Sequence, residues 1–429
     1  MSALFAELEW RGLVHQVTSP EVADRLDHGA LTAYIGFDPT ADSLHIGHLL
    51  QLCNLRRLQE HGHRPIALAG GGTGMIGDPG GKVEERSLLT EEALTANLAG
   101  IRDQLGRFLD FSPSAGAAQA RLVDNGDWLW KEGLLAFLRD VGKHFTVNQM
   151  ITRESVRARL EQREHGISFT EFSYMLLQAY DYLQLFDRYG CTLQMGASDQ
   201  WGNITLGVEL IRKVRGAEAF GLTTPLVLKP DGTKFGKTES GAVWLDGRRT
   251  SPYELFQFFV RSADAVVGRY LRYYTWLPLE RVEELEKATV EHPERRQAQL
   301  ALARAVTTLV HGTGEAAAAE RASQVLFGGG ELAGLDERTL LQVFSEAPST
   351  ERSRESLDGP GVSLVEALQE SGLVASRSAA RTTIGQGGVY VNNRKETDAD
   401  RRLTAGDLVG GRYVVLRRGK REHHLLRFG

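Results

Sequence analysis

The stretch LHIGHLL, residues 44–50, places two histidines three positions apart around a glycine, at the head of an apolar run. Residues three apart share one face of a helix, and the start of a helix attracts anions because its first N–H groups lack partners within the helix. His45 and His48 are therefore placed to donate hydrogen bonds to phosphate oxygens, while Gly47 leaves room for a flat ring or a backbone to approach. The alternatives are two solvated histidines or a partial metal site, but no third or fourth ligand lies close in sequence, so we expect no metal site.

Two glycine-containing segments add positive charge. GGGTGMIGDPGGKVEER, residues 70–86, follows a predicted buried strand and carries Lys82 and Arg86. It lacks the residue order of a GxxxxGK[ST] phosphate loop, and its alternative interpretation is a flexible surface loop. DGTKFGKTES, residues 231–240, carries Lys234 and Lys237 around a turn of small residues. Such lysine–glycine loops are common on surfaces, but the combination with the histidine pair is a far stronger indication of phosphate chemistry.

The elements that would position these residues alternate between strand and helix. Apolar runs bounded by turn residues predict buried strands at 31–38, 64–71, 120–124 and 190–196. Helical periodicity follows at 45–62, 89–110, 126–142, 170–188 and 198–214. This alternation predicts an α/β fold with a doubly wound, Rossmann-like parallel sheet. In such a sheet, ligands bind at the carboxyl ends of the strands.

The later part of the chain has a different organisation. From about 250 to 330 the patterns are helical without intervening strands, and SEAPSTERSRESLDGP (345–360) is a polar, Ser-rich stretch typical of a linker. A small mixed α/β domain follows it. We expect a Rossmann-like domain at 1–222, a loop and helical domain at 223–330, a linker at 331–360 and the small domain at 361–429.

Composition excludes several classes of protein. Of the 429 residues, 42% are hydrophobic and 24% are charged, which is ordinary for a soluble globular protein. No apolar run is long enough to span a bilayer, and the N-terminus lacks the pattern of a secretory signal. Cys53 and Cys191 cannot form a disulfide framework, which fits a reducing cytoplasm, although one disulfide stays formally possible.

The net charge of −5 argues against a protein that coats nucleic acid nonspecifically, but the charge is distributed unevenly. Residues 361–429 hold twelve Lys/Arg against seven Asp/Glu, and the rest of the chain holds thirty-eight against forty-eight. A basic tail on an acidic body is expected where one end contacts a polyanion. From charge alone, a solvated surface with chance charge explains the tail equally well.

Taken together, these motifs resemble a known family. HIGH at 45–48 followed by KFGKT at 234–238 is similar to the signature pair of the class I aminoacyl-tRNA synthetases. YIGFDPTADSLHIGH, FSYMLLQAYDYLQL and QMGASDQWGNI narrow the resemblance to the bacterial tyrosyl-tRNA synthetases, over essentially the whole chain. The resemblance implies activation of L-tyrosine with ATP, followed by transfer to the 3′ end of tRNA(Tyr). It also implies a cytoplasmic homodimer, ATP with Mg²⁺ as substrate, and no tightly bound cofactor.

The resemblance further implies roles for individual residues. Tyrosine would be bound by Tyr34, Asp78, Asn125, Tyr174, Gln178, Asp181 and Gln200. The ATP side would be formed by Gly36, Asp38, Gly47, Gly196, Asp199 and Lys237. The triphosphate would be contacted by Thr40, His45, His48, Lys82, Arg86, Lys234 and Lys237. In the tail, which resembles a small RNA-binding domain, tRNA phosphates would be contacted by Arg377, Arg381, Arg394 and Lys395.

These roles make physical sense. Tyr34 and Asp181 would meet the phenolic hydroxyl of tyrosine, so that phenylalanine would leave both unpaired. Asp78 would hold the ammonium with Tyr174 and Gln178, supported by Asn125. Tyr174, Gln178 and Asp181 are spaced i, i+4, i+7 and so share one helix face, although an amphipathic helix with polar positions turned outward explains that spacing too.

The implied reaction is attack of the tyrosine carboxylate on the α-phosphorus of ATP. It needs no protein nucleophile or general base, so catalysis must come from positioning and from stabilising charge on the transferring phosphate. The chain departs from the family pattern at Phe235 and Gly236, where Met and Ser are usual, and at Ala197, where a second glycine is usual. Three rival interpretations are a tryptophanyl-tRNA synthetase, a catalytically silent RNA-binding or splicing-helper paralogue, and a nucleotidylyltransferase that acts without tRNA.

Overall fold

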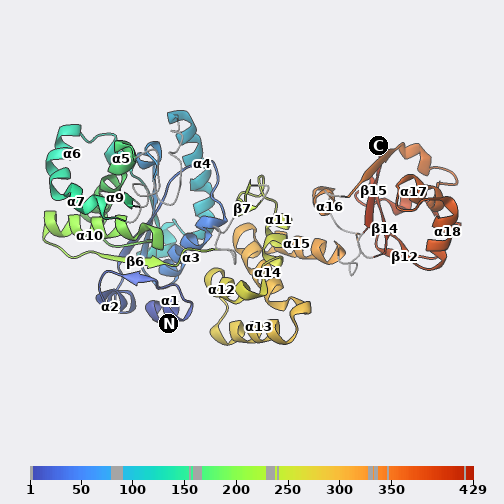
Figure 1. Cartoon of the computed structure of the whole chain (residues 1–429), viewed down its shortest axis with the longest axis horizontal. Helices are drawn as coiled ribbons and strands as arrows, with labels where there is room; N and C mark the ends of the chain where they lie inside the picture. The colour runs from blue at the N-terminus through green and yellow to red at the C-terminus, as the bar shows by residue number, and fades with distance from the viewer. Residues whose placement is uncertain are drawn as a thin grey trace. The chain divides into compact units, whose positions relative to one another are not determined.

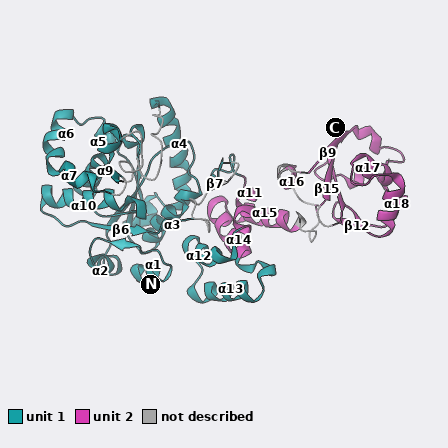
Figure 2. Ribbon diagram, viewed as in Figure 1, with its two compact units in different colours: residues 1–250, 262–298 teal, residues 251–261, 299–429 magenta. Residues whose placement is uncertain are grey.

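The computed structural model describes residues 3–78, 90–153, 156–157, 167–228, 237–238, 241–326, 332, 337–344, 347–419 and 422–429. Lys82, Arg86 and Lys234 lie outside the described residues, and only the backbone of Lys237 is described. The chain divides into two compact units, residues 1–250 with 262–298 and residues 251–261 with 299–429 (Figure 2).

A six-stranded sheet forms the centre of the first unit (Figure 1). Its spatial order is β1-β6-β5-β2-β3-β4. All neighbouring pairs are parallel except β1 with β6. The doubly wound parallel sheet predicted from the sequence is thereby confirmed. The strands are β1 (Gln16–Val17), β2 (Thr32–Phe37), β3 (Arg64–Ala69), β4 (Arg121–Asp124), β5 (Cys191–Ala197) and β6 (Phe220–Thr224).

The strand order reverses beside β2. From β2 the chain moves outward through β3 and β4, and it then returns to place β5 on the other side of β2. Tyr34 lies opposite Ile66 of β3 and Gln194 of β5 in the register. A crevice outside the carboxyl ends of the strands opens at such a reversal, which is where a ligand site is expected in this class of sheet.

Helices of the first unit begin and end at residues with recognisable capping chemistry. Ser168 accepts a hydrogen bond from the Glu171 N–H at the start of α9, and Gly190, with φ 62°, ends that helix. The helices are α1 (Leu4–Trp10), α2 (Glu21–His28), α3 (Ile46–Glu60), α4 (Glu91–Phe108), α5 (Gly126–Leu129), α6 (Leu134–Asp140), α7 (Val147–Ile151), α9 (Phe169–Tyr189), α10 (Trp201–Arg215), α12 (Asp264–Tyr274) and α13 (Leu279–Glu291). A short hairpin of β7 (Lys237–Thr238) and β8 (Gly241–Ala242) also belongs to this unit.

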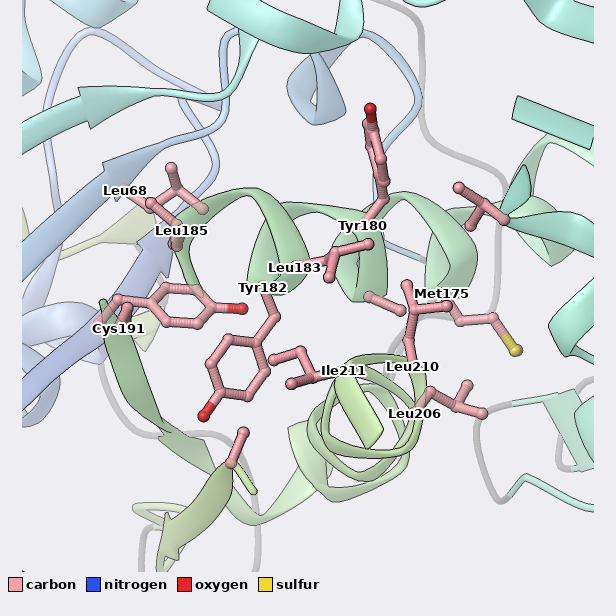
Figure 3. Close-up of a cluster of buried hydrophobic side chains, with 14 of the residues drawn as sticks. Leu68, Met175, Tyr180, Tyr182, Leu183, Leu185, Cys191, Leu206, Leu210 and Ile211 are labelled. Carbon is pink, nitrogen blue, oxygen red and sulfur yellow. The ribbon is translucent and has the colours of Figure 1, made fainter. Parts of the chain in front are cut away.

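Buried apolar side chains join α9 and α10 to the central strands (Figure 3). The Tyr34 ring of β2 packs against the Tyr182 ring of α9, with centroids 5.2 Å apart. Leu206, Leu210 and Ile211 of α10 belong to the same cluster. This packing fixes α9 against β2 and β5, so the polar residues at its other positions have a rigid support.

The second unit holds the remaining helices and a separate sheet of order β12-β11-β14-β15-β9. Its helices are α11 (Pro252–Val260), α14 (Gln297–His311), α15 (Thr313–Leu326), α16 (Glu337–Val343), α17 (Leu364–Glu370) and α18 (Arg377–Gly385). Its strands are β9 (Ser349–Arg352), β10 (Val362–Ser363), β11 (Val389–Val391), β12 (Arg394–Glu396), β13 (Arg402–Leu403), β14 (Tyr413–Arg418) and β15 (Glu422–Phe428). α17 and α18 share a buried core with β11, β14 and β15.

Strand β9 falls within the stretch that the sequence analysis interpreted as a linker. It pairs in parallel with β15, Ser349 lying opposite Leu425. Its alternating exposed and half-buried residues carry no apolar run, which explains why the sequence pattern did not indicate a strand. Within the described helices, none combines the length and the hydropathy needed to cross a membrane.

Candidate active site

Polar side chains gather where the carboxyl ends of β2, β3, β4 and β5 meet the N-terminal half of α9 and the segment after β5. Strand β2, the segments that follow β2, β3, β4 and β5, and helix α9 supply them. Those described with side chains and predicted from the sequence to bind tyrosine or the nucleotide base and ribose are Tyr34, Asp38, Asp78, Asn125, Tyr174, Gln178, Asp181, Asp199 and Gln200.

Asp181 is a buried carboxylate held by two N–H donors. Its Oδ2 accepts from Asn125 Nδ2 at 2.8 Å and its Oδ1 from Trp128 Nε1 at 2.8 Å. Burial nevertheless raises the pKa of Asp181 to about 8, because loss of solvent outweighs these two hydrogen bonds, which lower it. Such a group placed in a cleft is a candidate for function.

This raised pKa predicts a pH dependence of stability. The folded pKa, about 8, exceeds the ordinary value of 3.8, so the folded state holds the proton longer than the unfolded state. The stabilisation is fully present below about pH 4 and is lost as the pH rises towards and through 8. Between pH 5 and pH 8.5, Asp181 is expected to lower the free energy of unfolding by a few kcal/mol, on the order of one per pH unit. We expect Asp181→Asn to remove this part of the fall. Urea titrations at the two pH values measure it, and an unchanged slope contradicts it.

Tyr34 is buried within the electrostatic influence of Asp181 and has an unsatisfied hydroxyl. Its side chain is 1% exposed, and its Oη has no hydrogen-bond partner. Burial first, and then the charge of Asp181, raises the pKa of Tyr34 well above its usual value, so the phenol stays protonated. A buried hydroxyl without a partner costs free energy, and it is the kind of group that a ligand hydroxyl can satisfy.

A chain of hydrogen bonds runs from Tyr174 through Asp38 and Thr73 to Asn125. Tyr174 Oη donates to Asp38 Oδ2 at 2.9 Å, and Thr73 Oγ1 donates to Asp38 Oδ1 at 2.9 Å. Asn125 Nδ2 donates to Thr73 and to Asp181, and its Oδ1 accepts from the Gly72 N–H. Both amide hydrogens of Asn125 are thus engaged, whereas the sequence analysis expected this residue to support Asp78.

Asp78 is held by a chain of amides. Gln200 Nε2 donates to Asp78 Oδ2 at 2.6 Å, and Gln178 Nε2 donates to Gln200 Oε1 at 3.2 Å. Asn203 Nδ2 then donates to Gln178 Oε1 at 2.9 Å. The structure therefore brings together three of the predicted tyrosine-binding residues in one hydrogen-bonded row, with a carboxylate at its end.

The two histidines form the start of α3. His45 Nδ1 accepts from the Gly47 N–H at 3.0 Å, and His48 Nδ1 accepts from the His45 N–H at 3.2 Å. The rings stack with centroids 4.0 Å apart. Because each Nδ1 accepts, the proton of each neutral imidazole sits on Nε2. Both rings can therefore offer an Nε2–H donor to an anion at this helix terminus.

The glycines after β3 make room for protein groups. A Cβ at Gly70 would lie 2.2 Å from Asp38 Oδ1, and one at Gly71 would lie 2.1 Å from Asp124 Oδ1. These two glycines therefore let the backbone approach the carboxylates of Asp38, which follows β2, and Asp124 of β4. At Gly36 a Cβ would meet nothing within 4 Å, so the space beside β2 is open there.

The remaining predicted residues are placed as follows. Thr40, Gly47 and Asp199 are exposed, while Gly196 is buried against Gln200. In the second unit, Arg377 and Arg381 lie on α18. Arg377 pairs with Glu366 at 3.1 Å, and Arg381 pairs with Asp400 at 3.3 Å. Arg394 and Lys395 lie exposed on β12.

Three residues of the polar network were missed by the sequence analysis: Thr73, Trp128 and Asn203. Trp128 and Thr73 stand near Asn125 and the glycine cluster in sequence, but only the fold reveals that their donors meet Asp181 and Asp38. Asn203 stands in the quoted motif QMGASDQWGNI, which was its one available signal.

Comparisons with known proteins agree along the whole chain. A family model described as tRNA synthetases class I (W and Y) matches residues 26–328, and one described as tyrosine--tRNA ligase SYY-like C-terminal domain matches residues 339–426. The chain is 55% identical to the tyrosine--tRNA ligase of Roseiflexus castenholzii, covering 100% of both chains, and 51% identical to that of Geobacillus stearothermophilus, covering 99% of both. Among solved structures, a C-terminally truncated mitochondrial tyrosyl-tRNA synthetase of Aspergillus nidulans matches with TM-score 0.68 and 34% identity, over 76% of this chain and 95% of that one.

Proposed function

This chain belongs to the class I tRNA synthetases of the W and Y family, and we propose that it activates L-tyrosine with ATP and transfers it to the 3′ end of tRNA(Tyr). Its relatives of about half identical sequence, matched over their full length, carry the name tyrosine--tRNA ligase. The observation that supports tyrosine most directly is the buried Tyr34 hydroxyl, which has no partner and lies within the electrostatic influence of the Asp181 carboxyl group.

In this proposal the phenolic hydroxyl of the substrate donates to Asp181 and accepts from Tyr34. Phenylalanine would leave the Tyr34 hydroxyl without a partner and would give Asp181 no donor beyond Asn125 and Trp128, so it would make neither of these two hydrogen bonds. An indole has a donor but no acceptor, so it could not satisfy the Tyr34 hydroxyl. The pair therefore favours a phenol over both other aromatic side chains.

The other end of the amino acid would lie near Asp78. The Asp78 carboxylate accepts from Gln200, and its charge contributes to raising the pKa of Tyr174. A carboxylate in this place suits an ammonium group. With the ammonium there, the tyrosine carboxylate is left to attack the α-phosphorus of ATP, and pyrophosphate leaves. Bound Mg²⁺ would enter with the phosphates of ATP and neutralise part of their charge.

Catalysis would then rest on positioning and on charge at the phosphates. The Nε2–H groups of His45 and His48 would donate to phosphate oxygens at the start of α3. Thr40, Lys82, Arg86, Lys234 and Lys237 would complete the set of phosphate contacts, and Gly36, Asp38, Gly47, Gly196 and Asp199 the adenosine side.

ATP–pyrophosphate exchange with each amino acid offered singly tests this function. Exchange with tyrosine and very little with phenylalanine is the expected result. Exchange with tryptophan instead would keep the family and overturn the roles of Tyr34 and Asp181. No exchange with any amino acid would favour the silent RNA-binding paralogue, and exchange without charging of tRNA(Tyr) would favour a nucleotidylyltransferase.

We also propose that the protein is a homodimer, because exposed apolar side chains gather on consecutive elements of the first unit. Among the described residues, the large apolar side chains that stay exposed on α5 to α9 are Trp130, Leu134, Leu135, Leu138, Val147, Ile151 and Phe169. Clustered exposure of this kind marks an interaction surface. A second copy is the partner that the resemblance to the family implies.

Leu135→Glu is therefore expected to weaken the dimer. Leu135 is 81% exposed in the single chain, and burying a glutamate there would cost both the lost apolar contact and an unpaired charge. We expect the dissociation constant to rise at least about 100-fold, measured by sedimentation velocity. Val290→Glu on α13 is the matched control, since Val290 is 83% exposed but lies on another element. Equal behaviour of the two variants would contradict the proposed surface.

The second unit would bind the tRNA in the cytoplasm. Arg377 and Arg381 lie one turn apart on α18, and Arg394 and Lys395 are neighbours on β12. The acidic partners of Arg377 and Arg381 are 42% and 87% exposed, so a phosphate could exchange for them at small cost. These residues would contact the RNA backbone, and their contribution would weaken as salt rises.

A further inference from the structure

A short backbone ladder leads from the segment that carries Lys237 to the helix start that carries His45. In the β7–β8 hairpin, Lys237 lies opposite Ala242 and Thr238 lies opposite Gly241. The three residues after this hairpin run antiparallel to the residues around His45, and Trp244 is the bridge partner of His45. Two flanking hydrogen bonds of 2.9 Å each fix the register, Ile46 N to Val243 O and Leu245 N to Leu44 O.

The Trp244 side chain lies at the centre of a closed set of contacts. Its ring meets the His45 ring edge-on, with centroids 6.1 Å apart and planes at 66°. The Arg249 guanidinium covers the indole, with Cζ 4.4 Å from the ring centroid. Arg249 also pairs with Asp42 at 2.7 Å, and Asp42 lies three residues before His45. The contact of the indole with the His45 ring and the ion pair of Arg249 with Asp42 thus make two side-chain connections across the ladder.

The surroundings make this arrangement stiff. Val243 and Leu245, on either side of Trp244, are 6% and 1% exposed, so they are packed in the interior. The backbone N–H of Trp244 donates to Thr250 Oγ1 at 2.9 Å, and this hydrogen bond fixes the turn that returns Arg249 to the indole. The half-buried indole contacts a histidine ring on one side and a guanidinium on the other, and a guanidinium over an indole face is attracted by the charge distribution of the ring.

From these contacts we propose that Trp244 is a positioning residue for adenylate formation. It holds the His45 imidazole and the hairpin that carries Lys237 in a fixed relation, with Arg249 and Asp42 holding Trp244 in turn. The proposal rests on the function proposed above, in which His45 and Lys237 contact the phosphates. Trp244 itself does not touch the substrate in this proposal and acts through its neighbours.

The test is single-turnover formation of the adenylate at saturating ATP, with tyrosine affinity measured by equilibrium dialysis. Trp244→Leu is expected to lower the rate constant roughly tenfold, since small misplacements of groups that contact the reacting atoms cost up to about 10². Tyrosine affinity is expected to stay within about twofold. Trp244→Phe keeps an aromatic ring against both neighbours, and we expect it to recover most of the rate.

Two further comparisons separate positioning from general damage. Arg249→Gln is expected to lower the rate several-fold, because it removes the ion pair with Asp42. Arg248→Gln is the control. It removes the adjacent charge, which pairs with Asp246, and it is expected to leave the rate unchanged. In a His45→Ala background, Trp244→Leu should cost at most about threefold, because the two residues then share one lost function.

Several outcomes would overturn the proposal. A wild-type rate in Trp244→Leu would do so, as would an equal loss of rate and of tyrosine affinity, or full additivity with His45→Ala. If Trp244→Leu does not fold, the surface variant Arg249→Gln alone decides, and a wild-type rate in it counts against the proposal. Failure of the proposed function is a separate result, because the unmodified protein would then show no exchange with tyrosine.

Discussion

His48→Ala is expected to slow adenylate formation by roughly 10²-fold while tyrosine binds almost as tightly as before. The size follows from removing one donor aimed at charge that develops on a phosphate, which typically costs 10²–10³ in rate. We expect tyrosine affinity to be spared because the His48 ring stacks on His45 at the start of α3, whereas the hydrogen bonds described above for Asp78 and Asp181 are made by Gln200, Asn125 and Trp128. Single-turnover rates and tyrosine dissociation constants measure the two quantities separately.

The exposed His15 provides the control, since His15→Ala removes an imidazole that is not among the residues of the candidate site. We expect no change in that variant. The His45/His48 double variant should lose less than the product of the single losses, because the His45 N–H donates to His48 Nδ1 and the pair acts as one unit. Equal losses of rate and tyrosine affinity in His48→Ala would remove the phosphate role.

Most strands with two-sided burial could be predicted from the sequence, although β6, whose residues are all buried, was not predicted. β2, β3 and β5 are apolar runs bounded by turn residues, and their alternation with helices predicts a parallel sheet. β1 has only two residues and no apolar run, and the sequence analysis did not predict it. A short edge strand is defined by its partner rather than by its own sequence, and here that partner is β6.

Parts of the site could be predicted for a similar reason. His45 and His48 lie three residues apart at the start of α3, where a capping box brings their rings to a centroid distance of 4.0 Å, so their proximity depends only on local sequence. The partners of Asp181 could not be predicted in this way, since Asn125 and Trp128 are 56 and 53 residues away along the chain. Contacts of that range depend on the strand order, which places β4 and α9 at the same end of the sheet.

The second prediction with a large effect concerns Tyr34→Phe. We expect selectivity for tyrosine over phenylalanine to fall by about tenfold in ATP–pyrophosphate exchange. The substitution removes one hydrogen bond to the tyrosine hydroxyl, which contributes about 1.4 kcal/mol. Phenylalanine is unaffected, because the Tyr34 hydroxyl is already without a partner in the free protein. Selectivity within threefold of the unmodified protein would contradict the proposed pocket.

The same substitution should not weaken the fold. The Tyr34 hydroxyl is buried without a partner in the free protein, so its removal relieves a desolvation cost and is expected to raise the free energy of unfolding by up to about 1 kcal/mol. Tyr182→Phe is the matched control, because this equally buried hydroxyl donates to the Phe220 carbonyl at 2.8 Å. That variant should lose about 1 kcal/mol of stability and keep its selectivity. The opposite signs would mean that the chain retains an unsatisfied hydroxyl at Tyr34 for its ligand, at the expense of stability.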